Sequence, residues 1–297
     1  MNSDFSKNRN FSECMSEALS LMTGNFRSLL RGTWKSLVAM ALSLTFTFVL
    51  ISELQTVVSF ATESPVVYCI FLCLAVILSL ISLSWMLAAI ASLFTKVTIK
   101  SLFKDSAYVV GIYVIGIAII ITLSAILCYA LNGRLYVVDS TFIYDNWPWI
   151  LGLLLISMLV MQPLTLVSSV RLFHLSEQAN SVKSLLKMAL RYRSYLFIGK
   201  FSSVLIFFVI ASIVFLPMAI LMLASINSWR GVIEGDPSGM PSGFIYYFII
   251  CSILTFFVVS FMGIWLVISN MLFSSSILAK EEERKSFVSQ DVNVLEK

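Results

Sequence analysis

The chain has 297 residues, of which 59% are hydrophobic and only 12% are charged, and its formal net charge is +4. A soluble domain is about 45–50% apolar and about 25% charged, so this composition excludes a soluble enzyme and a nucleic-acid-binding domain. It indicates a multi-pass membrane protein, and by itself it names no activity.

Three regions follow one another along the chain. Residues 1–35 are polar and amphipathic and are predicted to form a cytoplasmic N-terminal segment. Residues 36–280 are predicted to form one transmembrane domain, and residues 281–297 a charged cytoplasmic tail. The loops between the apolar runs are too short to hold a separate soluble domain.

Six apolar runs are long enough to cross a membrane. A helix needs about 20 apolar residues to span a hydrocarbon core of about 30 Å, and every backbone polar group in lipid must be satisfied within the protein. The runs are unbroken rather than alternating, which excludes barrel strands. We therefore predict an all-α bundle of six transmembrane helices, with spans near residues 36–58, 66–94, 107–131, 148–172, 196–225 and 244–279.

The basic residues are unevenly distributed among the segments that flank these spans. Eighteen of the 20 Lys and Arg residues fall in the N-terminal segment, the second and fourth loops and the C-terminal tail, whereas only Arg134 and Arg230 fall in the other loops. Segments rich in Lys and Arg stay in the cytoplasm, so both termini are predicted to be cytoplasmic. The compact loops favour a bacterial cytoplasmic membrane as the location.

A basic pentad occurs three times, each time just before an odd-numbered span. It reads Arg-Ser-Leu-Leu-Arg at residues 27–31, Lys-Ser-Leu-Phe-Lys at 100–104 and Lys-Ser-Leu-Leu-Lys at 183–187. Residues four apart share one face of a helix, so each copy predicts a short interfacial amphipathic helix. The unit would be such a helix plus a transmembrane hairpin, repeated three times in parallel. The basic rows comprise Arg27, Arg31 and Lys35; Lys96, Lys100 and Lys104; and Lys183, Lys187 and Arg191.

Two interpretations of these basic rows remain open. Basic residues flank the cytoplasmic ends of spans for insertion reasons alone, and their stems extend to the interface. The rows would then only anchor the chain, and their similarity would be convergent. Under the other hypothesis the copies come from a duplication, and the rows bind anionic lipid or a cytoplasmic protein partner.

The residues around the first repeat also carry a resemblance to a known group of proteins. Ala18 and Leu19 are followed by Asn25, Phe26 and Arg27, and a shorter echo stands at residues 189–190. In this layout the chain resembles uncharacterised bacterial six-span membrane proteins related to the membrane domain of some glycerophosphodiester phosphodiesterases. The resemblance implies a similar six-span layout. Their catalytic domain has no counterpart here, so it implies no catalysis.

The central parts of the six predicted spans contain no charged residue. A charge inside the bilayer is costly and usually functional, so its absence argues against a proton-coupled transporter. Arg171, His174 and Glu177 are spaced three apart at the inner end of the fourth span. They are interpreted as an interfacial cluster, with a role for His174 as a proton carrier or ligand as the alternative. No metal-ligand spacing, nucleotide loop or catalytic motif accompanies them, so we expect no cofactor, metal site or catalytic residue.

Four residues within the spans stand out: Gln162, Pro163, Pro217 and Asn270. Proline inside a helix frees a carbonyl and kinks the helix. Gln162 could bond that carbonyl or reach Asn270 across the bundle. The residues are interpreted either as packing kinks or as a hinge and polar pathway.

These observations favour a non-enzymatic membrane protein that acts as a subunit, scaffold or lipid-organising factor. Its expected partners are membrane lipids, anionic ones in particular, with a protein partner or a second copy left open and nucleic acid excluded. The alternative is a transporter or permease subunit for an apolar or zwitterionic solute. An intramembrane enzyme would require His174 to gather partners at one cavity.

Overall fold

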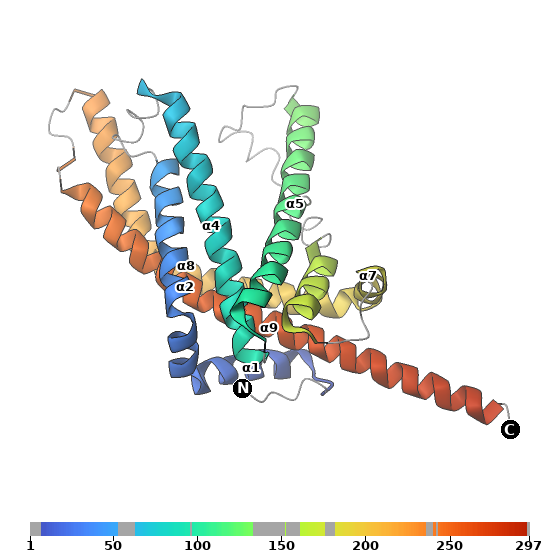
Figure 1. Cartoon of the computed structure of the whole chain (residues 1–297). Helices are drawn as coiled ribbons and strands as arrows, with labels where there is room; N and C mark the ends of the chain where they lie inside the picture. Colours follow the sequence, from blue (N-terminus) through green and yellow to red (C-terminus); the bar gives the residue numbers. More distant parts are fainter. Residues whose placement is uncertain are drawn as a thin grey trace. The chain divides into compact units, whose positions relative to one another are not determined.

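A computed structural model describes residues 7–52, 63–95, 97–132, 152, 161–175, 182–235, 240–241 and 243–295. Every secondary structure element in these ranges is a helix (Figure 1). A further helical stretch covers residues 161–173. The labelled helices are α1 (Phe11–Gly24), α2 (Phe26–Ile51), α4 (Pro65–Phe94), α5 (Ile99–Asn132), α7 (Val182–Arg191), α8 (Arg193–Ile233) and α9 (Phe244–Leu295).

Five of these helices, α2, α4, α5, α8 and α9, are by length and composition able to cross a membrane. They contain most of the first, second, third, fifth and sixth predicted spans, so the prediction of helical structure with helices of membrane length is confirmed for the described residues. Most of the predicted fourth span, residues 148–172, lies outside the described residues. The number of six spans therefore stays a prediction.

The surface of these helices is apolar over much of its area. In the most apolar 18-residue stretch of α4, and likewise of α8, only 11% of the residues are buried within the protein. Val66 and Ile70 on α4 are 70% and 61% exposed. Contiguous apolar surface on this scale is not left open to water in a soluble monomer, but it is what lipid tails cover.

Helix α9 is longer than a membrane requires. Its 52 residues extend over about 78 Å at about 1.5 Å per residue, against a hydrocarbon core of about 30 Å. The apolar part ends at Ala279, and Lys280 begins a run of charged residues. The predicted charged tail, residues 281–297, is thus largely a continuation of this helix, which ends at Leu295.

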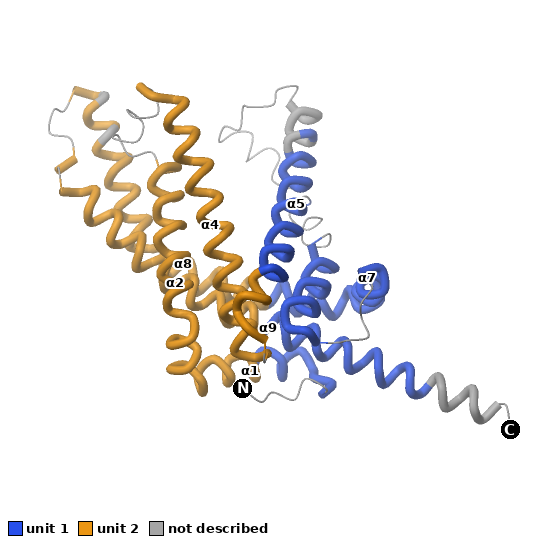
Figure 2. The backbone as a smooth tube through the Cα atoms, in the orientation of Figure 1, with its two compact units in different colours: residues 1–16, 104–202, 269–297 blue, residues 17–103, 203–268 orange. Residues whose placement is uncertain are grey.

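The described chain divides into two compact units, which are considered separately (Figure 2). Unit 2 comprises residues 17–103 and 203–268. Within it α2 packs along α4, and Gly32 permits close contact because a Cβ there would lie 2.8 Å from Leu93 Cδ2. A hydrogen bond of 3.0 Å joins the hydroxyl groups of Thr47 and Ser79 between the two helices.

Unit 1 comprises residues 1–16, 104–202 and 269–297. Its core draws on four helical segments, three of which follow one another in the sequence while the fourth, α9, is distant from them. The buried members are Leu166, Val167 and Val170 from the stretch 161–173, Leu185 and Ala189 from α7, Leu196 from α8 and Ile277 from α9.

The N-terminal residues of unit 1 are bonded to α9. The Arg9 backbone N–H donates to Ser276 Oγ at 3.0 Å, and that hydroxyl donates to the Arg9 carbonyl at 2.9 Å. Tyr195 OH donates to the same carbonyl at 2.9 Å, and Phe11 stacks on Phe273 at 5.6 Å between ring centroids. Ser276 is therefore the residue that fixes the entry of the chain into α1.

Replacing Ser276 by Ala should weaken this attachment. The substitution leaves a buried backbone N–H without its acceptor, which costs about 1–3 kcal/mol. Thermal unfolding of the full chain in detergent should show the loss, together with faster amide exchange over residues 9–14. Ser275→Ala is the matched control, because Ser275 is equally buried and its hydroxyl donates within its own helix, to the Leu272 carbonyl. An equal loss in both variants would contradict the attachment.

Candidate functional site

The three predicted basic rows do not share one structure. Arg27, Arg31 and Lys35 lie in the first turns of the long helix α2, and Lys100 and Lys104 in the first turns of α5. Only the third row lies on a short separate helix, α7. Lys96 lies outside the described residues.

The prediction of a separate short helix is therefore wrong for the first two rows. The reason is where the helix breaks. Gly24 and Asn25 interrupt the chain before the first row, with α1 ending at Gly24, and Val97 and Thr98 precede the start of α5. Glycine and asparagine favour helix ends, and β-branched residues are weaker helix formers. In the third copy the break, at Tyr192, follows the row instead.

Helix α7 presents three different faces. Leu185 and Ala189 are buried in the unit 1 core. The basic row, Lys183, Lys187 and Arg191, lies on the side of α7 opposite these two residues and is exposed. Between them runs an apolar row in which Val182 and Leu190 are 46% and 61% exposed. A basic row directly beside an exposed apolar row is the pattern of a helix in the membrane interface, where the cations reach the headgroups.

A groove lies between α7 and the charged part of α9. Its volume is about 490 Å³, which is within the usual range of about 300–1,000 Å³ for small-molecule sites. Its apolar floor comes from Leu185, Met188 and Leu278. The polar lining comprises Ser184, Lys187, Arg191, Glu281, Glu282, Arg284 and Lys285.

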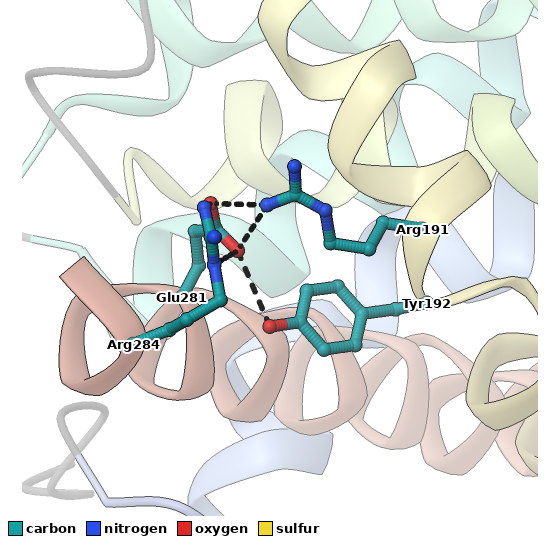
Figure 3. Close-up of polar contacts among 4 residues, drawn as sticks. All are labelled: Arg191, Tyr192, Glu281 and Arg284. Carbon is teal, nitrogen blue, oxygen red and sulfur yellow. Dashed lines mark hydrogen bonds and ion pairs between the residues drawn. The ribbon is translucent and has the colours of Figure 1, made fainter. Parts of the chain in front are cut away.

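The carboxylate of Glu281 holds two guanidinium groups together at this groove (Figure 3). Arg191 Nη1 donates to both Glu281 oxygens, at 2.9 and 3.1 Å. Arg284 donates through Nη2 at 2.7 Å and Nε at 3.1 Å. The Glu281 side chain is only 12% exposed, whereas those of Arg191 and Arg284 are 40% and 46% exposed. The network therefore buries its anion and presents its cations.

Tyr192, in the link between α7 and α8, completes the network. Its OH donates to Glu281 Oε2 at 3.2 Å. Burial of the ring, together with the neighbouring carboxylate, raises the pKa of Tyr192 above its ordinary value. The phenol therefore stays protonated and remains a donor throughout the physiological pH range.

A second, shallower hollow lies on unit 2 at the first basic row. It has a volume of about 460 Å³ and is lined by Arg27, Leu30, Arg31 and Trp34. The Lys35 ammonium lies 5.8 Å from the centre of the Trp34 ring. Two of the three predicted rows thus line a hollow.

The cluster around His174 is a polar network at a helix end, built on an ion pair between Arg171 and Asp105. Arg171 Nε lies 3.0 Å from Asp105 Oδ1 and its guanidinium stacks over the Tyr108 ring at 3.8 Å. His174 Nε2 lies 3.8 Å from Asp105 Oδ2. His174 has a positive φ of 48°, and the Leu175 N–H donates to the Val170 carbonyl at 3.2 Å, which is a Schellman-type cap.

This geometry explains His174 as a helix terminator. Its side chain is 51% exposed, and it lines neither of the two hollows described above. Among the described residues no group of three or more His, Cys, Asp or Glu side chains could hold a metal ion. Glu177, the third member predicted for this cluster, lies outside the described residues.

The residues predicted for a kink or pathway are divided between the units. Gln162, Pro163 and Asn270 belong to unit 1, and Pro217 to unit 2. Gln162 is buried at 3% exposure and its carbonyl accepts a bond from Thr165 Oγ1 at 2.7 Å. Pro217 lies inside α8 on an exposed position. None of the four lines the two hollows.

Sequence reasoning located the Arg191 row but missed Glu281 and Tyr192, which organise it. Arg284 three residues after Glu281 was a visible signal, since such residues are neighbours on a helix. The partnership with Arg191 spans 90 residues and leaves no local pattern.

Comparison with protein-family models, with curated proteins and with solved structures finds no match in any of the three. The resemblance to six-span proteins related to the phosphodiesterase membrane domain therefore stays a prediction. The class of the chain rests on its own architecture: the described residues form helices, and several of these are long and apolar enough to span a membrane.

Replacing Glu281 by Gln should loosen α7 from α9. The two guanidinium groups would lose the carboxylate between them and repel each other. Hydrogen bonds to charged groups contribute about 1.5–3 kcal/mol to stability, and partial exposure lowers this contribution for Glu281. Amide exchange over residues 182–191 should therefore rise about tenfold.

Glu282→Gln is the control for this prediction. It removes the same charge from the next residue, whose side chain is exposed and lines the groove. Unchanged exchange over residues 182–191 in the Glu281 variant, or equal acceleration in both, would contradict a specific role for Glu281.

Proposed function

We propose that this chain is a non-enzymatic membrane protein of six spans, with both termini in the cytoplasm, that holds anionic lipid at the inner surface of a bacterial cytoplasmic membrane. In this role it acts as a scaffold or subunit that organises lipid around itself. Its partners are acidic phospholipids and, through them, other proteins of the same membrane.

The observation that carries this proposal is the arrangement of rows on α7. Lys183, Lys187 and Arg191 are exposed beside the exposed apolar residues Val182 and Leu190. A helix with this surface gains stability where lipid tails and anionic headgroups meet. Each Lys or Arg near an anionic membrane surface contributes about 1 kcal/mol of attraction.

The first basic row supports the same role independently. Arg27 and Arg31 line a hollow together with Trp34, which is 49% exposed. Tryptophan is enriched at the level of the headgroups because its ring is both apolar and a hydrogen-bond donor. Arginine beside tryptophan at the start of an apolar helix therefore suits an anionic headgroup.

The transporter alternative has less support. Within unit 1, neither Gln162 nor Asn270 lines the groove between α7 and α9. Pro217 lies on an exposed position of α8. Burial of Gln162 suits the packing interpretation.

Quantitative lipid mass spectrometry of the protein purified in mild detergent tests the proposal. We expect phosphatidylglycerol to co-purify in excess over phosphatidylethanolamine, relative to their proportions in the membrane. Replacing Lys183 and Lys187 by Gln should reduce the retained phosphatidylglycerol by about half or more, since two contacts of about 1 kcal/mol each are removed.

Two further double variants test the other rows, separately and in combination. One replaces both Arg27 and Arg31 by Gln, and the other replaces both Lys100 and Lys104 by Gln. Unchanged retention in every variant would leave the rows an anchoring role only and would refute the proposal.

A further inference from the structure

The groove between α7 and α9 carries more charge than the interface location of α7 requires. Four cations line it, Lys187, Arg191, Arg284 and Lys285, against the two carboxylates of Glu281 and Glu282. The lining therefore has a formal excess of two positive charges, gathered around one hollow. Like charges are brought together in this way only at a cost, which a bound anion would offset.

The two guanidinium groups are oriented before any ligand arrives. Glu281 engages Nη1 of Arg191 and both Nε and Nη2 of Arg284. Each guanidinium has five N–H donors, so both keep donors beyond those that the carboxylate engages. The planar guanidinium group of arginine matches the oxygen geometry of phosphate. A carboxylate that fixes the orientation of two guanidinium groups therefore forms a preorganised oxyanion site.

Helix α9 also places the groove at a defined depth. Leu278, in its floor, belongs to the last apolar turn of α9, and Arg284 and Lys285 belong to the charged turns that follow. The apolar-to-charged transition of a membrane helix lies at the headgroup level. A ligand in this groove would have its anion among the cations and an apolar portion beside Leu185, Met188 and Leu278.

We propose that the groove between α7 and α9 binds a phosphate group, and that this phosphate belongs to a lipid headgroup. The excess of two positive charges matches a phosphomonoester, as in phosphatidic acid, better than a phosphodiester with one charge. The inference rests on the proposed lipid-holding function and adds a specific site and a headgroup class to it.

The test measures binding of dihexanoyl phosphatidic acid to the full chain in detergent by native mass spectrometry. We expect affinity at least about tenfold higher than for dihexanoyl phosphatidylcholine. The variant K187Q/K285Q removes two exposed cations and leaves the Glu281 network intact, so it should fold. Removing two exposed charge contacts should lower the affinity for phosphatidic acid about tenfold.

The control variant K7Q/R193Q removes two exposed cations that belong to none of the basic rows and do not line the groove. It should change the affinity for phosphatidic acid by less than about twofold. Equal effects of the two variants would mean that net charge, and not the groove, attracts the lipid, and would overturn the proposal.

Inorganic phosphate distinguishes the source of the anion. Millimolar phosphate should compete with phosphatidic acid for the full chain, and this competition should be lost in K187Q/K285Q. That result supports a phosphate site that lipid occupies. Phosphate binding without binding of phosphatidic acid would overturn the assignment to lipid. Binding of neither ligand would overturn the site.

The outcome for this groove is separable from the outcome for the lipid-holding function. Suppose that substitutions in the basic rows lower the retention of phosphatidylglycerol while K187Q/K285Q leaves the affinity for phosphatidic acid unchanged. That result would refute the groove site alone. No retained anionic lipid would refute the lipid-holding function, and phosphate binding would then still report on the groove.

Discussion

The structure depends on the requirement that polar groups be satisfied within each helix. Lipid offers no hydrogen bonds, so an unpaired backbone or hydroxyl group inside it costs several kcal/mol. Many of the described hydroxyl groups meet this cost within their own helix. Thr33 donates to the Leu29 carbonyl, Ser82 to Leu78 and Ser252 to Phe248, each one turn back in its own helix. Small polar residues can therefore lie in helix contacts without needing partners elsewhere.

Hydroxyl groups that bond outside their own helix have a different role. Ser276 exchanges two hydrogen bonds with the backbone of Arg9, and Tyr113 OH and Ser168 Oγ lie 3.3 Å apart. These contacts join segments of unit 1 that are far apart in the sequence. A serine that bonds within its own helix contributes little to specificity, whereas the few hydroxyl groups that bond across segments add specificity to the contacts that packing makes.

The same requirement moves the charges to the helix ends, where they become available for binding. Within unit 1 they form compact groups around one carboxylate each, Asp105 with Arg171 and Glu281 with Arg191 and Arg284. In both groups the cation is about 40% exposed or more, and the carboxylate is 20% exposed or less. The carboxylates thus act as supports that fix arginine side chains facing outward.

Much of the fold could be predicted from the sequence because it is set by composition and local pattern. Apolar runs of sufficient length specify helices in lipid, and the four-residue spacing of Lys183, Lys187 and Arg191 predicted the exposed face of α7. The starts of α2 and α5 could not be predicted as well. They depend on which of a few weak breaking residues ends a helix, and such preferences amount to about 1 kcal/mol or less.

The Glu281 network was beyond sequence reasoning for a different reason. The apolar core of unit 1 brings Leu185 of α7 beside Ile277 of α9, and this packing is what places Arg191 within reach of Glu281. The ion pair is a consequence of hydrophobic packing one to two turns away on each helix. Its partners are therefore encoded in the shapes of the buried residues, and the charges alone do not reveal them.

The continuity of α9 links this packing to the membrane. Within unit 1, α9 runs without interruption from the apolar turns that end at Ala279 to the charged turns that line the groove. A rigid helix fixes the rise between these two parts at about 1.5 Å per residue. In the proposed location, moving the groove away from the headgroup level would bring apolar residues into water or charged residues into lipid, each of which is costly. A flexible tail of the same composition would carry the same charges but would hold them at no defined depth.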